Sequence, residues 1–231
     1  DDNVAIGNSA LGANTTASSN TAVGSAALLV NTTGNENTAI GISALAANTT
    51  GANNVSMGGN SMTANTTGAD NVAVGRSALR DNTTAANNTA VGRAALAVNT
   101  TVSNLTAIGM SALTANTTGT NGVAVGKDAL QANTTGDNNT AVGLEAAQTN
   151  TTGDALTAVG TGALASNTTA NDNTAVGRSA LGAITTGANN TAVGSLAGDA
   201  TDDGAGNTAI GYAALSANCG DGNVAVGSSA G

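Results

Sequence analysis

Few side chains in this sequence of 231 residues could carry out chemistry. The sequence contains no His, so its single Cys, Cys219, has no imidazole to act as a base, and the usual nucleophile–base pairs are absent. Six of the fourteen carboxylate side chains precede predicted strands and fit turn formers and solubilising charges; they are Glu36, Asp70, Asp137, Asp154, Asp172 and Asp221. We therefore predict that the chain is not an enzyme and needs no cofactor.

One acidic stretch could bind a metal ion. Residues 199–207 read D-A-T-D-D-G-A-G-N, and Asp202, Asp203 and Asn207 could supply some of the oxygen ligands that calcium requires. The glycine-rich G-G-x-G-x-D repeat of calcium-binding β-helices is missing. We favour a plain acidic loop and keep the three residues as weak candidates.

Asparagine modification is a further chemistry that the sequence allows. The recurring Asn-Thr-Thr satisfies the N-x-S/T rule for N-glycosylation. The positions are Asn14, Asn31, Asn48, Asn65, Asn82, Asn99, Asn116, Asn133, Asn150 and Asn167, and Asn54, Asn87, Asn104, Asn138 and Asn189 also satisfy the rule. In a glycosylated fibre we expect sugars on outward-facing Asn side chains of the Asn-Thr-Thr turns. The interpretation that we favour is that Asn and Thr form turns and stacked hydrogen-bonded ladders.

An internal repeat that covers the whole chain must position these segments. One glycine recurs every 17 residues, with a final spacing of 16. The positions are Gly7, Gly24, Gly41, Gly58, Gly75, Gly92, Gly109, Gly126, Gly143, Gly160, Gly177, Gly194, Gly211 and Gly227. The consensus N-T-A-V-G-x-S-A-L-x-A-N-T-T-G-x-x fits one coil of a parallel β-solenoid. We predict an all-β domain of fourteen coils over residues 1–231, a rod about 65 Å long and a fragment of a longer fibrous protein.

The columns of the repeat predict which segments form strands. A β-branched residue, Ala and a second β-branched residue precede the glycine in nearly every coil, which favours a short strand. The segment around Ser-Ala-Leu is ambiguous: we favour a strand-like arc, with a helical turn as the alternative. Because side chains alternate across a strand, Ala should point away from the two β-branched residues. We expect the Ala face to be exposed and to form the interface of a lateral homo-oligomer, predicted to be a trimer, through Ala5, Ala22, Ala39, Ala73 and their counterparts. The matching end coils could also stack head to tail.

Charge and hydropathy exclude two classes of partner. The net charge of −9, with only five basic residues, argues against nucleic acid. No apolar run reaches the 18 residues of a membrane span. Four basic residues and the only aromatic residue follow the repeat glycine in a variable column that we predict to be an exposed contact stripe: Arg76, Arg93, Lys127, Arg178 and Tyr212.

The motif also resembles a known family. Asn3-Val4-Ala5-Ile6-Gly7 and Asn223-Val224-Ala225-Val226-Gly227 resemble the N-S-V-A-I-G signature of trimeric autotransporter adhesin heads, although the coil here is longer by Asn-Thr-Thr-Gly. Similar arrays also look like segments of phage tail fibres and bacterial surface proteins. The resemblance implies parallel β-rolls, three chains side by side, that bind host or matrix surfaces.

We therefore expect an extracellular structural or adhesive fibre segment on a cell surface or virion. One alternative is a solenoid that binds ice or a ligand through stacked Thr and Asn. In the turns, however, the Thr residues are adjacent and should point apart rather than form the Thr-x-Thr pattern of a flat face. A second alternative is an N-glycosylated, self-assembling extracellular filament.

Overall fold

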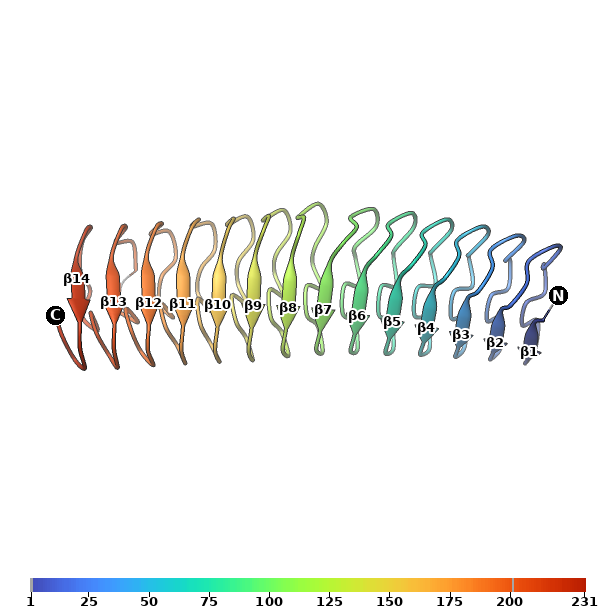
Figure 1. Ribbon diagram of the computed structural model, residues 1–231, viewed down its shortest axis with the longest axis horizontal. Helices are drawn as coiled ribbons and strands as arrows, with labels where there is room; N and C mark the ends of the chain where they lie inside the picture. The colour runs from blue at the N-terminus through green and yellow to red at the C-terminus, as the bar shows by residue number, and fades with distance from the viewer. Residues whose placement is uncertain (1, 201) are drawn as a thin grey trace. The chain divides into compact units, whose positions relative to one another are not determined.

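The computed structural model describes residues 2–200 and 202–231 and confirms an all-β parallel solenoid with one strand in each repeat (Figure 1). The contacts divide the chain into two compact units, Asp1–Thr118 and Gly119–Gly231. The strands of the first unit are β1 (Val4–Ile6), β2 (Thr21–Val23), β3 (Thr38–Ile40), β4 (Val55–Met57), β5 (Val72–Val74), β6 (Thr89–Val91) and β7 (Thr106–Ile108). Those of the second are β8 (Val123–Val125), β9 (Thr140–Val142), β10 (Thr157–Val159), β11 (Thr174–Val176), β12 (Thr191–Val193), β13 (Thr208–Ile210) and β14 (Val224–Val226).

Within each unit, every strand pairs in parallel with the strand of the next coil. Ala22 of β2 pairs with Ala39 of β3 in the first unit, and Ala158 of β10 pairs with Ala175 of β11 in the second. Equivalent residues of successive repeats therefore stack in columns.

The strand glycines are required by this stacking. At Gly160 the backbone φ is +135°, and a Cβ atom would lie 2.4 Å from the carbonyl oxygen of Gly177 in the next coil. A side chain at this position would be strained and would also overlap the neighbouring backbone.

The strand Ala residues point inward, so the prediction of an exposed Ala face is wrong. Ala22, Ala39 and Ala73 are fully buried, and Ala5 is exposed in the first coil. Leu side chains from the segment after the glycine fill the space beside them. At Gly198, which replaces one such Leu, a Cβ would lie 2.8 Å from Leu181 Cδ2 and 3.8 Å from the strand Ala192 Cβ. The interior beside the strand is thus lined by Ala, and the β-branched residues face outward.

The segment after each strand glycine forms consecutive tight turns, so both the predicted arc and the helical turn are wrong. Left-handed residues recur two and four positions after the glycine, as at Ser43 (φ 54°) and Leu45 (φ 51°). Successive left-handed residues direct their N–H groups to opposite neighbours. Ser43 N–H donates to Ser25 O of the previous coil at 2.9 Å, and Leu45 N–H donates to Ser61 O of the next coil at 3.1 Å.

Two columns of buried Asn side chains stabilise the coils, as the ladder interpretation predicted. In the turn ladder, formed by the Asn of Asn-Thr-Thr, Asn48 Nδ2 donates to Asn31 Oδ1 at 2.8 Å and to Gly51 O at 2.9 Å. In the pre-strand ladder, formed by the Asn immediately before each strand, Asn37 Nδ2 donates to the same Gly51 O at 2.8 Å. The pre-strand positions are Asn3, Asn20, Asn37, Asn54, Asn71, Asn88, Asn139, Asn173, Asn190, Asn207 and Asn223.

Candidate interaction face

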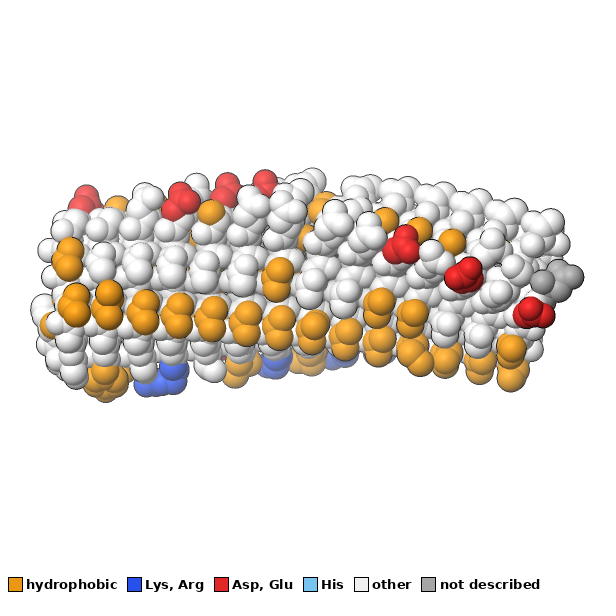
Figure 2. Space-filling model, viewed as in Figure 1, with side chains coloured by type: hydrophobic (Ala, Val, Ile, Leu, Met, Phe, Trp, Pro, Cys, Tyr) orange, Lys and Arg blue, Asp and Glu red, His pale blue; other side chains and the backbone are white. Residues whose placement is uncertain are grey.

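The outward side of the strands forms a regular uncharged surface, which we call the Thr/Val face. It consists of the first residue of each strand, Thr or Val, and the third residue, Val, Ile or Met. The third residues inside each unit are half-buried or exposed, and the exposed fraction of the side chain reaches 40% for Ile108 in the first unit and 40% for Val193 in the second. Figure 2 shows them as a row of hydrophobic side chains along the strands.

The geometry of the Thr/Val face follows from the parallel register. Because each strand pairs residue for residue with the next, the outward side chains lie in two ranks, with neighbours within a rank about 4.8 Å apart. The face is two side chains wide and carries no charge in any strand. Such a face can contact another flat surface but offers no group for acid–base chemistry.

Charged residues border the Thr/Val face on opposite edges. Just beyond the strand glycine, the structure places all five residues of the predicted contact stripe at exposed positions. On the other edge, five residues before the glycine, Glu36, Asp70 and Asp172 are exposed in left-handed turns with φ of 57°. Figure 2 shows acidic atoms above the hydrophobic row and basic atoms below it. The face therefore has an acidic edge and a basic edge.

Among the described residues, Lys127 is the only edge charge that takes part in an ion pair. In the described part of the chain, the ion pairs are Arg80 with Asp81 at 2.6 Å and Lys127 with Asp128 at 3.2 Å. The hydrogen bond that Arg80 donates to the Asp81 carboxylate raises the pKa of Arg80. Neither pair includes an acidic-edge residue, and Lys127 is the only basic-edge residue in them.

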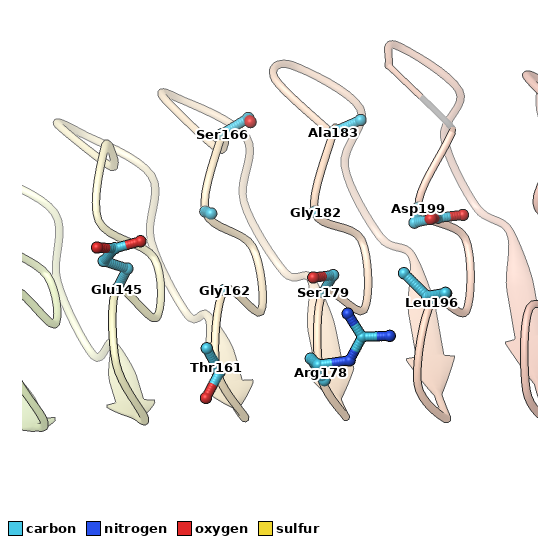
Figure 3. A pocket seen from close by; sticks show the side chains of 11 residues that line it. Glu145, Thr161, Gly162, Ser166, Arg178, Ser179, Gly182, Ala183, Leu196 and Asp199 are labelled. Atoms are coloured by element: carbon cyan, nitrogen blue, oxygen red, sulfur yellow. The ribbon is translucent and has the colours of Figure 1, made fainter.

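A shallow groove lies elsewhere in the second unit, over the turns of four successive coils (Figure 3). It has a volume of about 560 Å³ and is open to solvent. Gly162 and Gly182 leave its centre without side chains, and Glu145, Arg178 and Asp199 supply charges at its rim. No aromatic side chain lines it, so it lacks the apolar walls typical of a small-molecule pocket.

The weak metal candidates occupy different environments. Asn207 is buried in the pre-strand ladder, where its Oδ1 accepts a hydrogen bond from the backbone N–H of Asn223 at 2.8 Å. Asp202 and Asp203 are exposed, and Asp202 Oδ1 accepts from Thr185 Oγ1 at 2.7 Å. Among the described residues, no three or more His, Cys, Asp or Glu side chains are grouped to hold a metal ion.

The expected outward orientation of the Asn-Thr-Thr asparagines is wrong. Nine of the ten are buried, and Asn14 of the first coil is half-buried. Their Nδ2 atoms, which would carry the sugar, face the ladder, as in Asn48 and Asn65. Of the other five sequons, Asn54 is buried, whereas Asn87, Asn104, Asn138 and Asn189 are exposed on the acidic-edge side of the strands.

Sequence reasoning missed the Thr/Val face because it placed these side chains inside. Alternation along a strand shows which residues share a side but not which side is interior. The sizes of the residues could have shown which side is interior. The Leu and Ala columns fit together in a narrow interior, whereas Leu together with the first and third residues of each strand would overfill it.

Comparison with known proteins does not place this chain in a family. Neither the models of known protein families nor the curated proteins contain a match to this chain. No helix among the described residues is long and apolar enough to cross a membrane.

Proposed function

We propose that the chain is a segment of an extracellular structural and adhesive fibre, carried on a cell surface or a virion. The observation that supports this proposal is that each coil finds its hydrogen-bond partners in the coils before and after it. Coils of this kind can be added without a new type of core, so the number of repeats sets the length. A fibre needs this property, whereas a catalytic domain does not.

Surface labelling tests the location. Antibodies raised against the purified chain are applied to intact and to permeabilised cells or virions of the source, with an internal protein as the control. We expect the intact particles to be labelled. Label that appears only after permeabilisation contradicts the proposal.

The adhesive role is assigned to the basic edge and Tyr212, because this column is exposed and its residue type changes from coil to coil. Binding of the chain to immobilised matrix or host cells is compared with binding of a variant that carries Arg93→Ser, Lys127→Ser and Tyr212→Ser. We expect weaker binding of the variant with unchanged thermal stability. If the variant binds as well as the unchanged chain, this column has no role in adhesion.

A second candidate function is ordering of water or ice on the Thr/Val face. The turn threonines do not form that surface: Thr32 Oγ1, for example, donates to Thr49 O of the next coil at 3.0 Å. The strand threonines do point outward in a regular rank, which favours this alternative. On this alternative, we expect the unchanged chain to inhibit ice recrystallisation and a variant with Thr89→Lys and Thr106→Lys to lose that inhibition. If the unchanged chain does not inhibit recrystallisation, the alternative is wrong.

A further inference from the structure

We propose that the Thr/Val face is covered by the same face of a second copy of this chain, with the coils of the two copies parallel and in register. This pairing goes beyond the fibre function and holds whether or not that function is correct. It starts from the exposed ranks of Val, Ile and Met, such as Ile40 and Ile108, which no described part of the chain covers. Soluble proteins seldom leave a contiguous apolar surface of this kind open.

The area of the face is sufficient for a stable pair. With strands about 4.8 Å apart and a face about 10 Å wide, each coil contributes about 50 Å². The seven strands of each unit then give about 350 Å², so covering the faces of both units buries about 700 Å² of each copy and about 1,400 Å² in the pair. This lies within the range of specific protein–protein interfaces. In each unit the face is only two side chains wide, so one opposing face covers it, and we propose two copies in place of the predicted three.

The charged edges determine the orientation of the pair. When two parallel copies meet face to face around a two-fold axis along the stacking direction, the acidic edge of each lies opposite the basic edge of the other. An antiparallel pair would instead place acidic edge against acidic edge. Exposed ion pairs contribute little affinity but discriminate between such arrangements, because an antiparallel pair leaves the acidic-edge carboxylates without an opposing basic residue.

The positions of the charges also determine the register. One coil in each unit carries both an acidic-edge carboxylate and a basic-edge arginine: Asp70 and Arg76 flank β5, and Asp172 and Arg178 flank β11. In a symmetric parallel pair, each coil faces its own counterpart. Asp70 of one copy then lies opposite Arg76 of the other, and Asp172 opposite Arg178. A shift by one coil separates Asp172 from Arg178, because the neighbouring coils carry Thr161 and Ser195 at that position.

Charge reversal tests the pairing. Arg76→Asp with Arg178→Asp makes both edges acidic at these coils, and Asp70→Arg with Asp172→Arg makes both basic. By sedimentation we expect each double variant to self-associate at least about tenfold more weakly than the unchanged chain. Mixing the two should restore pairing, and combining all four changes in one chain should restore self-pairing. The matched control is Arg93→Asp with Lys127→Asp, because Asn87 and Asn121 occupy the acidic edge of those coils.

Spin labels test the orientation. Cys is introduced at Ser19 or at Asn87, two exposed positions in equivalent places of the first unit, in a Cys219→Ser background. A parallel pair in register gives the same distance between copies at both positions. An antiparallel pair gives distances that differ between the two positions and would overturn the proposal.

Three further outcomes would also overturn it. They are a monomeric unchanged chain, a trimer, and double charge variants that pair as well as the control. A monomer that inhibits ice recrystallisation would assign the face to ice instead. Ile40→Lys with Ile108→Lys should give a folded monomer, and thermal unfolding of every variant shows that loss of pairing is not loss of fold.

Discussion

Asn167 is the last residue of the turn ladder because Ile184 occupies the equivalent position in the next coil. The Oδ1 of Asn167 is buried without a hydrogen-bond partner, whereas the Oδ1 of Asn150 accepts from Asn167 Nδ2 at 2.9 Å. The ladder therefore has an interior position, Asn150, and an end position, Asn167, in the same unit. The contributions of these two residues to the free energy of unfolding can be compared.

The first prediction compares Asn150→Ala with Asn167→Ala. Asn150 makes bonds to Asn133, Gly153 O, Gly153 N–H and Asn167, so its loss leaves buried polar groups unpaired on both sides. We expect a cost of about 2–4 kcal/mol at Asn150 and about half of that at Asn167, measured by urea unfolding. Equal costs would show that the ladder does not act through contacts between neighbouring coils.

The second prediction concerns the left-handed Leu residues. Leu79 is buried with φ of 47°, and Met62 occupies the same column with the same φ. A β-branched side chain clashes with its own backbone in this conformation. Leu79→Ile should therefore cost about 1–3 kcal/mol more than Leu79→Met, although all three side chains have similar volumes. Unfolding midpoints measure the difference, and the argument fails if Ile is tolerated as well as Met.

The third prediction concerns the strand glycines. Gly160→Ala places a Cβ 2.4 Å from the Gly177 carbonyl oxygen, in addition to the unfavourable φ. We expect a loss of at least about 3 kcal/mol, measured by chemical unfolding. Gly220→Ala is the control, because no atom lies within 4 Å of its Cβ, and it should change stability by less than about 0.5 kcal/mol.

The fourth prediction is that a glycosylating host can modify the folded chain at only four sequons: Asn87, Asn104, Asn138 and Asn189. Their side chains are exposed, whereas nine of the ten turn-ladder asparagines are buried and the Nδ2 of the half-buried Asn14 donates to Ala17 O at 3.1 Å. Intact mass should show at most four glycans, and Asn→Gln at all four should return the mass to that of the bare chain. A sugar on Asn48 or Asn65 of folded protein would contradict this prediction.

The strands and their parallel stacking could be predicted from particular residues. Thr21, Ala22 and Val23 have the composition of a strand, and Gly24 allows the chain to bend after it. The 17-residue spacing places each such triplet beside the next. The interior side of the strand could not be predicted in this way. It depends on how much volume Leu28 of the same coil leaves beside Ala22, and that volume is set by the path of the turns between them.

The turns after the strands were predicted wrongly because left-handed conformation is a tertiary property of Leu45 and Ser43. Their φ angles are stabilised by hydrogen bonds to the next and previous coils, and neither residue favours that conformation alone. One sequence signal was present. No residue with positive φ in the described chain is Val, Ile or Thr, although the adjoining strands consist largely of these residues.

The hydrogen bonds between coils have a mechanical consequence. They run along the direction in which the coils of a unit stack, so a pulling force on the two ends of a unit acts along them. All coils of the unit then carry the same load, and an end coil, which is bonded on one side only, should yield first, followed by the others one at a time. Every step would release 17 residues, or about 58 Å of extended chain. Such a segment would lengthen in steps under tension and dissipate mechanical work gradually.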